Sequence, residues 1–326
     1  VSFTNPYMLT QLNLDSFNSI LISYQNNPEF QKTVAQQLFG AKEIKGVLPV
    51  GINEKYKEGD GIYLDNINIL SYTDPENVGV DSKKLFKKID SIINYAIENK
   101  MTPGAQILIA KNSKVIYEKS FGKLRYNEDI KTNSKTIYDL ASLTKILVTT
   151  PIVMNLVDQR VIGLETKLKN IMSRYEDSNK SDITIKELLS GHAGLQAWIP
   201  FYKMTLDEEN KPSSKYYSFK KNKINSIKVA PDLFLRADYI DTIRNIIKES
   251  DLLKTKYKYS DLSYLIIQEY IEDFYNQNLE EIIEKLLFKK LGVDLTYNPY
   301  IKKFTNLSLL YNTGATCKYF FLCHRS

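Results

Sequence analysis

The sequence predicts a chain of the mixed α/β (α+β) class, in which a mixed-sheet subdomain and an all-helical subdomain follow an incomplete α/β segment at the N-terminal end. A β-hairpin is predicted over 105–120, because apolar residues alternate with polar ones there. Helices are predicted over 184–189, 236–250 and 262–290, which have the apolar content and spacing of helices. Strands beside a helical block favour a fold in two parts, with a functional serine between them.

The composition indicates a globular chain. Its 326 residues, 43% of them hydrophobic, are enough for about two domains with a sizeable core. The net charge of +6 comes from 44 basic and 38 acidic residues. The basic clusters at 220–223 and 254–258 lack the pattern of a nucleic-acid motif, so they predict solvated surface and no nucleic-acid partner. Lys, Asn and Asp interrupt each apolar run before it reaches the length of a membrane span.

Three segments are predicted along the chain: residues 1–65, a linker at 66–81, and a domain at 82–326. The stretch from 51 to 81 contains glycine and proline without helical periodicity, which is typical of a connection between domains. From 82 to 100 the apolar residues return at helical spacing, so the second domain is predicted to begin with a helix. No internal repeat occurs in the sequence.

A serine and a lysine lie three residues apart at Ser142 and Lys145, just before the apolar run 146–157. Residues at this spacing share one face of a helix. A serine hydroxyl is a poor nucleophile until a neighbouring group takes or shares its proton, and a lysine amine one turn along can do so. Serine beta-lactamases and penicillin-binding proteins use this S-x-x-K pattern. Pro151 is expected to kink the helix one or two turns after the lysine.

Two other serines match the same pattern. Ser120 ends a predicted strand and is followed by Gly122, while Ser218 lies in a polar tract predicted to be a loop. Only Ser142 would place the pair on a buried, rigid element, although it could also serve merely as the cap of a core helix.

A second candidate group occurs at Tyr259, in the run Tyr259-Ser260-Asp261, just before an apolar segment predicted to be a helix. A hydrolase of this type needs a second base facing the nucleophile. A tyrosine can serve, because a nearby lysine favours its ionised form. Tyr24 and Tyr72 begin similar runs, so the choice of Tyr259 rests on the order of the motifs and on the predicted helix that follows.

Three ordered motifs resemble those of the class C beta-lactamase-related serine hydrolases. They are Ala141-Ser142-Leu143-Thr144-Lys145, Leu188-Leu189-Ser190-Gly191-His192-Ala193-Gly194-Leu195 and Tyr259-Ser260-Asp261. The resemblance runs from about residue 82 to the end and includes Thr102-Pro103-Gly104-Ala105 before the first strand. It implies a beta-lactamase/transpeptidase-like fold and a hydrolase that needs no cofactor or metal.

The resemblance also implies a role for each matching residue. Ser142 would be the acylated nucleophile, and its backbone N–H would form half of an oxyanion hole. Lys145 would be its proton partner. Tyr259 would relay the proton to the leaving atom and later activate water. Asp261 would position the substrate or Lys145. His192 lies one place later than the family's histidine, so it is expected to be structural.

The family's third motif, Lys or His followed by x-Gly, is not found after Tyr259. The runs 312–314 and 324–326 do not lie in a suitable predicted strand, which suggests a C-terminally incomplete domain. Cys317 and Cys323 also fall in this last segment, and two cysteines with one histidine are too few ligands to predict a zinc site.

Residues 1–65 resemble the C-terminal end of the second domain of family 3 glycoside hydrolases. The resemblance rests on a predicted strand at 19–24, a predicted helix at 28–38 and the turns at 39–50. It implies a bimodular bacterial enzyme of cell-wall or glycan metabolism, with a beta-N-acetylhexosaminidase-like partner domain. The segment is too short for a core of its own. It could instead be an extension that packs on the hydrolase domain. The chain opens with Val1 and shows no signal peptide, so a start inside a domain is expected.

The predicted function is that of a serine hydrolase acting on an ester, amide or peptide, with a small-molecule, peptide or glycan-derived substrate. Trp198 is the best candidate for the wall of the substrate cleft, with further aromatic residues at 202, 216, 217 and 219; packing in the helical part is the alternative. Two other interpretations stay open: a noncatalytic, inactive fragment, and a parent protein whose activity is that of a glycosidase. A bacterial periplasm or cell envelope is implied by the resemblance alone.

Overall fold

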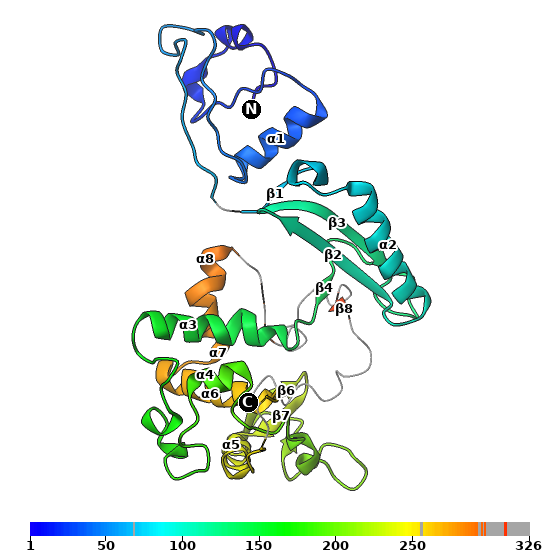
Figure 1. The fold of residues 1–326 in the computed structure, drawn as a ribbon, viewed down its shortest axis with the longest axis vertical. Helices are drawn as coiled ribbons and strands as arrows, with labels where there is room; N and C mark the ends of the chain where they lie inside the picture. Colours follow the sequence, from blue (N-terminus) through cyan, green and yellow to red (C-terminus); the bar gives the residue numbers. More distant parts are fainter. Residues whose placement is uncertain (68, 255–256, 293–294, 296, 298–309, 312–326) are drawn as a thin grey trace. The chain divides into compact units, whose positions relative to one another are not determined.

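A computed structural model describes residues 1–67, 69–254, 257–292, 295, 297 and 310–311. The chain divides into two compact units, Val1–Lys135 and Thr136–Ser326. This division falls inside the predicted domain 82–326, and the predicted domain bounds stay a prediction. The mixed α/β class is confirmed, since helices accompany small sheets in the described residues (Figure 1). The runs 312–314 and 324–326, which were considered for the Lys/His-x-Gly motif, lie outside the described residues, as do Cys317 and Cys323.

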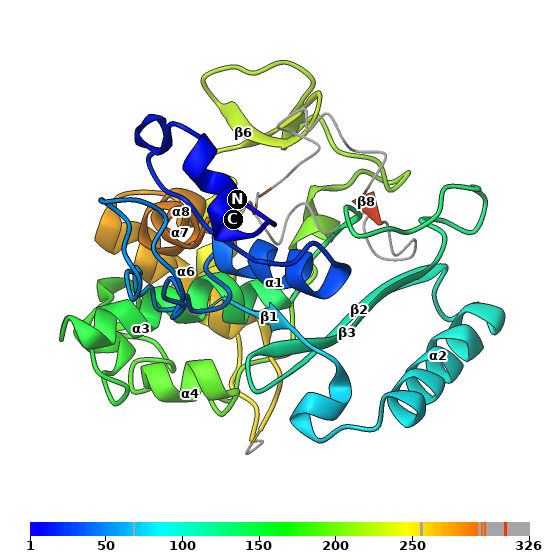
Figure 2. The ribbon, with the colours of Figure 1, turned by 90° about the horizontal axis from the view of Figure 1, so that it is seen from above.

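The first unit contains a helix beside a three-stranded sheet. Its elements are α1 (Pro28–Leu38), β1 (Ser71–Tyr72), α2 (Ser82–Glu98), β2 (Gly104–Lys111) and β3 (Lys114–Gly122). The sheet order is β1-β3-β2, with β2 and β3 antiparallel as the predicted hairpin requires. Asn112 and Ser113 both have positive φ, as a tight two-residue hairpin turn demands. Helix α2 lies along the hairpin (Figures 1 and 2).

The N-terminal segment of this unit is lightly packed. Helix α1 begins as the sequence predicts, with Asn27 capping its first turn and Pro28 at its first position. The predicted strand at 19–24 does not form; within it Ile22 makes a single bridge to Ser2, and Tyr24 has a positive φ of 57°. The segment's buried cluster consists of only Leu9, Leu14 and Ile52, which is little apolar surface to support regular strands.

The second unit holds the larger core. Its elements are β4 (Ile137–Tyr138), α3 (Thr150–Asp158), α4 (Ile185–Ser190), β5 (Tyr217–Ser218), β6 (Asn225–Ala230), β7 (Leu233–Arg236), α5 (Tyr239–Glu249), α6 (Asp261–Tyr275), α7 (Leu279–Ile283), α8 (Lys289–Leu291) and β8 (Leu310–Tyr311). Helices α3, α4, α5 and α6 meet through fully or nearly fully buried side chains such as Leu156, Leu188, Ile243 and Ile266. Strand β4 pairs in parallel with β8.

Two sequence predictions for this unit are wrong in detail. The subdomain expected to be all-helical also contains a small antiparallel sheet, ordered β5-β7-β6. Val229 and Leu235 bury against the helical core, and this packing favours strands. The helix predicted over 262–290 is divided after Tyr275, because Asn276 adopts a left-handed conformation and Asn278 caps a new helix.

Two ionisable side chains are buried in this core with partners. Glu269 is 5% exposed and pairs with the Nε atoms of Arg174 at 2.9 Å and Arg244 at 3.4 Å. Burial raises the pKa of Glu269, against the pull of the two arginines. Lys180 is fully buried, and its Nζ donates to the backbone oxygens of Lys248 and Ser250 at the end of α5 and to the side chain of Asn179. These contacts cover carbonyls that a helix end leaves without partners.

No helix among the described residues combines the length and apolar character needed to cross a bilayer. The same part of the chain contains no group of three or more His, Cys, Asp or Glu side chains placed to hold a metal ion.

Candidate active site

Ser142 lies in the tight turn between β4 and the following helix. Ala141 has a φ of 42°, and its N–H donates to Asp139 Oδ1 at 2.8 Å, so an aspartate side chain stabilises an unusual backbone conformation beside the serine. Short-range bonds from Thr144 N to Ala141 O and from Lys145 N to Ser142 O start the helix. Among the described residues the Ser142 N–H has no acceptor, as at other helix N-termini. It is therefore available to a ligand.

Lys145 begins a π-helical turn, Lys145–Thr149, that joins α3. The Thr150 hydroxyl donates to Lys145 O at 2.8 Å. Pro151 has no N–H to close an α-helical bond, and an adjacent π turn is one way in which a helix accommodates this loss. The irregularity expected after the lysine is thus a widened turn directly before the proline.

The Lys145 ammonium lies at the centre of the candidate site. Its Nζ donates to Ser142 Oγ at 3.1 Å and to Asp261 Oδ1 at 2.5 Å, and the lysine side chain is 14% exposed. The Tyr259 ring centroid is 5.1 Å from Nζ. Burial disfavours the charge and is the largest single influence. The hydrogen bond and charge of Asp261, helped by Tyr259, outweigh it and raise the pKa of Lys145. The lysine is therefore an ammonium at neutral pH.

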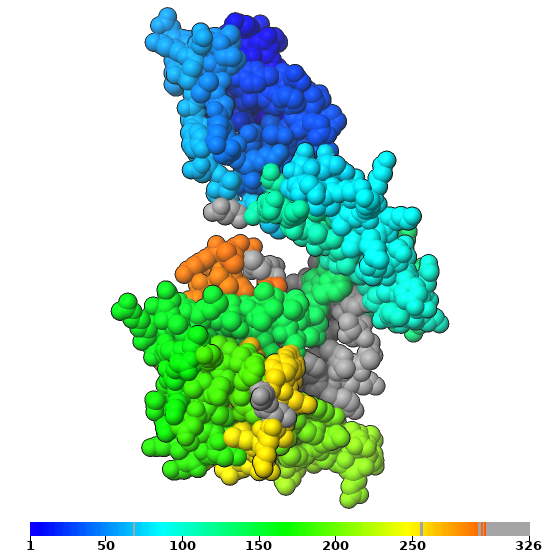
Figure 3. Space-filling model, in the orientation of Figure 1, coloured from blue at the N-terminus to red at the C-terminus, as the bar shows by residue number. Residues whose placement is uncertain are grey.

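The loop after α4 forms the seat of the Tyr259 segment. Lys258 N donates to Gly191 O at 2.8 Å, Ser260 Oγ to Gln196 O at 2.6 Å, and Asp261 N to Ala197 O at 2.8 Å. Ser260 also caps α6 by accepting from Leu262 N. Figure 3 shows yellow surface, the colour of residues near 250 and 260, beside green surface of the same unit. The loop that follows α4 thus positions the Tyr259-Ser260-Asp261 motif.

Gly191 is required in this loop for two reasons. Its φ of 75° lies in the left-handed region, and a Cβ there would lie 3.0 Å from the Tyr257 ring and 3.1 Å from Lys258 O. The neighbouring His192 has contacts of its own: Nδ1 lies 3.0 Å from Ser190 Oγ, and the ring packs at a tilt against the Tyr257 ring. This placement agrees with the structural role expected for His192.

The structure brings Ser142, Lys145, Tyr259 and Asp261 together, and leaves Trp198 beside them. Trp198 is 54% exposed and directly follows Ala197, whose oxygen accepts from Asp261 N; no contact with Ser142 or Lys145 accompanies this placement in the described residues. Tyr217 is buried against Thr205, and Tyr216 stacks on Tyr239. These two aromatic residues pack in the helical unit, as the alternative interpretation allowed.

Ser120 and Ser218 are decoy serines, which match the S-x-x-K pattern elsewhere in the chain, and they lack the same arrangement. Ser120 lies on β3, and Lys123 pairs with Asp129 at 2.5 Å. Ser218 lies on β5, where its Oγ donates to Lys220 O. Neither serine receives a hydrogen bond from a lysine amine among the described residues.

The sequence interpretation did not include Tyr264. Its ring centroid is 5.7 Å from Lys145 Nζ, and its hydroxyl donates to Leu189 O at 3.3 Å. A signal was present, because Tyr264 follows Asp261 by three residues and this spacing places both on one helical face.

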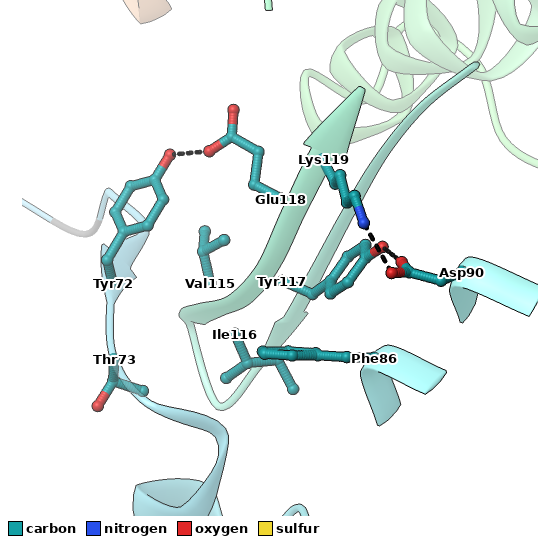
Figure 4. Close-up of a pocket in the computed structure, with 9 residues that line it drawn as sticks. All are labelled: Tyr72, Thr73, Phe86, Asp90, Val115, Ile116, Tyr117, Glu118 and Lys119. Carbon is teal, nitrogen blue, oxygen red and sulfur yellow. Dashed lines mark hydrogen bonds and ion pairs between the residues drawn. The ribbon is translucent and has the colours of Figure 1, made fainter. Parts of the chain in front are cut away.

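A hollow of about 450 Å³ lies in the first unit. Its polar side chains satisfy one another: Tyr72 Oη donates to Glu118, and both Tyr117 and Lys119 donate to Asp90 (Figure 4). Lys119 and Tyr117 hold the pKa of Asp90 below its usual value. None of the predicted site residues lines this hollow, and its hydrogen-bonded pairs offer no activated nucleophile.

Comparisons with known proteins find relatives of this chain. The chain is 26% identical over 254 residues to candidate D-alanyl-D-alanine carboxypeptidases of Salmonella gallinarum and Salmonella typhimurium, covering 73% of this chain and 52% of each relative. The chain thus spans about half the length of these curated relatives. The octameric penicillin-binding protein homologue from Pyrococcus abyssi shares the fold, with a TM-score of 0.51, 19% identity, and coverage of 69% of this chain and 47% of that one.

The family model described as "Beta-lactamase" matches residues 89–314, well over half of the chain. This match spans the turn of Ser142, the loop after α4 and the start of α6. The chain therefore belongs to the beta-lactamase family.

Proposed function

We propose that the chain is a serine hydrolase that forms an acyl-enzyme at Ser142 and acts on an ester, amide or peptide. One observation carries the proposal: Lys145 Nζ bridges Ser142 Oγ and Asp261 Oδ1 in a largely buried position. A serine that merely caps a helix has no need of such a partner. The ammonium next to Oγ stabilises negative charge on that oxygen as it attacks.

In the proposed reaction Tyr259, whose ring lies beside the Lys145 ammonium, relays protons. As Oγ of Ser142 bonds to the substrate's carbonyl carbon, its proton passes to the Tyr259 oxygen, which gives its own proton to the leaving atom. The bond from that carbon to the leaving oxygen or nitrogen breaks as the leaving atom accepts this proton. Water next attacks the acyl-enzyme and gives one proton to Tyr259. The ester bond to Ser142 breaks, Oγ regains the proton, and a carboxylic acid is released.

The substrate class is proposed from the relatives. Since those proteins are named as candidate D-alanyl-D-alanine carboxypeptidases, a peptide of the cell wall is the first substrate to test, and the bacterial periplasm or envelope is the proposed location. Trp198, exposed beside the site, would wall the acyl cleft. We also propose that residues 1–65 are the end of a family 3 glycoside hydrolase domain, so that the parent protein processes glycans as well.

Covalent labelling tests the hydrolase proposal. The chain is incubated with a fluorophosphonate, and the adduct is mapped by mass spectrometry to the peptide that contains Ser142. Ser142→Ala should abolish the adduct, while Ser120→Ala and Ser218→Ala should keep it. A folded wild-type chain without an adduct would support the noncatalytic interpretation instead. Labelling at Ser120 or Ser218 would show that the nucleophile is assigned wrongly.

A further inference from the structure

The start of α6 surrounds the candidate lysine on several sides. Tyr259 precedes the helix, Asp261 is its first residue, and Tyr264 lies one turn later. The Lys145 Nζ atom is 2.5 Å from the carboxylate and within 6 Å of both ring centroids, at 5.1 and 5.7 Å. Both rings are thus within the range at which an aromatic face attracts a cation. Nζ also donates to Ser142 Oγ.

The Tyr264 ring is itself held in place. It is partly buried, and its hydroxyl donates to Leu189 O. Leu189 lies in the last turn of α4, where carbonyl oxygens lack helical partners. One end of the tyrosine is thus tied to α4, and the ring comes to lie beside the lysine.

We propose that Tyr264 is a positioning residue, which together with Asp261 and Tyr259 holds the Lys145 ammonium against Ser142. Asp261 supplies the charge, but a single carboxylate contact fixes the distance to Nζ and not the direction from which the amine approaches. A second ring restricts that direction, because a cation between two aromatic faces and a carboxylate has one preferred place. The inference rests on the proposed function only for its consequence in catalysis.

Two variants separate the ring from the hydroxyl. Tyr264→Phe keeps the ring and loses the bond to Leu189, whereas Tyr264→Met keeps a similar volume and loses the ring. Tyr270→Met, on the same helix but packed on Phe274, is the matched control for loss of a tyrosine from α6. Circular dichroism first establishes that each variant is folded. If Tyr264→Met does not fold, Tyr264→Leu takes its place.

The measured quantity is the pH midpoint at which Lys145 becomes reactive. Each variant is pulse-acetylated with acetic anhydride across the alkaline range, and acetylation of the Lys145 peptide is quantified by mass spectrometry, with the exposed Lys87 as internal reference. We expect the midpoint to fall by about 0.5 to 1 pH unit in Tyr264→Met, since the cation loses one aromatic face. It should stay at the wild-type value in Tyr264→Phe and in Tyr270→Met. Greater exposure alone would raise the midpoint, because burial disfavours the ammonium form of Lys145.

The same variants are then labelled with the fluorophosphonate. We expect labelling of Ser142 to slow by about fivefold to tenfold in Tyr264→Met and to stay near wild type in Tyr264→Phe. An unchanged or higher midpoint in Tyr264→Met would overturn the inference, as would an equal fall in Tyr264→Phe. The acetylation result decides the matter even if wild-type Ser142 takes no label, an outcome that would count against the proposed function alone.

Discussion

Replacing Lys145 by alanine removes the group that links the candidate nucleophile to the rest of the site. The variant loses the donor 3.1 Å from Ser142 Oγ and leaves Asp261 without its ion-pair partner. The fold should survive, because Asp261 is 38% exposed and water can replace the ammonium. We expect a loss of about 1 kcal/mol in the free energy of unfolding, discounted for this solvent access.

The effect on chemistry should be far larger than the effect on stability. Loss of a positioned group that moves or balances a proton typically slows a reaction by about 10²- to 10⁴-fold. We therefore expect fluorophosphonate labelling of Ser142 to slow by at least about a hundredfold in Lys145→Ala, measured as the rate of adduct formation by intact-protein mass spectrometry. The Lys123→Ala variant, which changes the lysine of a decoy motif, should label at the wild-type rate.

The comparison of rate with stability decides the assignment. A Lys145→Ala variant that unfolds at nearly the wild-type temperature but labels as fast as wild type would refute the role of this lysine. An equal loss of labelling in Lys123→Ala would show that the assay reports general destabilisation of the chain instead.

Three further outcomes are expected from the structure. Asp261→Asn removes the carboxylate that raises the pKa of Lys145. The rate of fluorophosphonate labelling should fall at alkaline pH as the ammonium loses its proton, and in this variant the fall should occur about one pH unit lower than in wild type. A labelling rate that rises through this pH range would contradict the role of the ammonium. Lys180→Met leaves Lys248 O without its donor and removes one of the two donors to Ser250 O, the other being Asn179 Nδ2. This variant should lower the free energy of unfolding by about 2 kcal/mol in urea titration, whereas Lys186→Met, exposed on α4, should change it by less than about 0.5 kcal/mol. Equal effects would contradict the capping role. Gly191→Ala forces a Cβ against Lys258 O at positive φ. We expect the free energy of unfolding to fall by about 1–2 kcal/mol and the labelling of Ser142 to slow. Wild-type values for both would refute the role of this loop in positioning Tyr259.

The sequence was sufficient to predict secondary structure where local signals and tertiary packing favour the same element. Helices α1 and α2 and the β2–β3 hairpin match the predicted spans, since caps, helical spacing and a turn all act locally. Ser142, Lys145, Tyr259 and Asp261 lie close together, as the order of three motifs suggests, while their roles stay a prediction.

The sequence was not sufficient where distant packing decides. The three strands between Tyr217 and Arg236 have short and irregular patterns, and their apolar residues settle only against the helical core. Tyr264 was missed because the chain is rich in tyrosine, and only the contact with Lys145 distinguishes this one. The segment 19–24 has the residues of a strand but pairs through one bridging residue instead of with a partner strand.

The π-helical turn at Lys145–Thr149 sets the direction in which the side chains before it point, relative to those of α3 after it. An α-helix turns by about 100° for each residue, so a turn with one extra residue rotates the helix on its N-terminal side by that amount relative to the helix on its C-terminal side. Ile152 and Leu156 can therefore face the core while Lys145 faces Asp261. Deleting a single residue between Lys145 and Pro151 would leave the composition almost unchanged, yet it would turn either the amine away from its carboxylate or the apolar face away from the core.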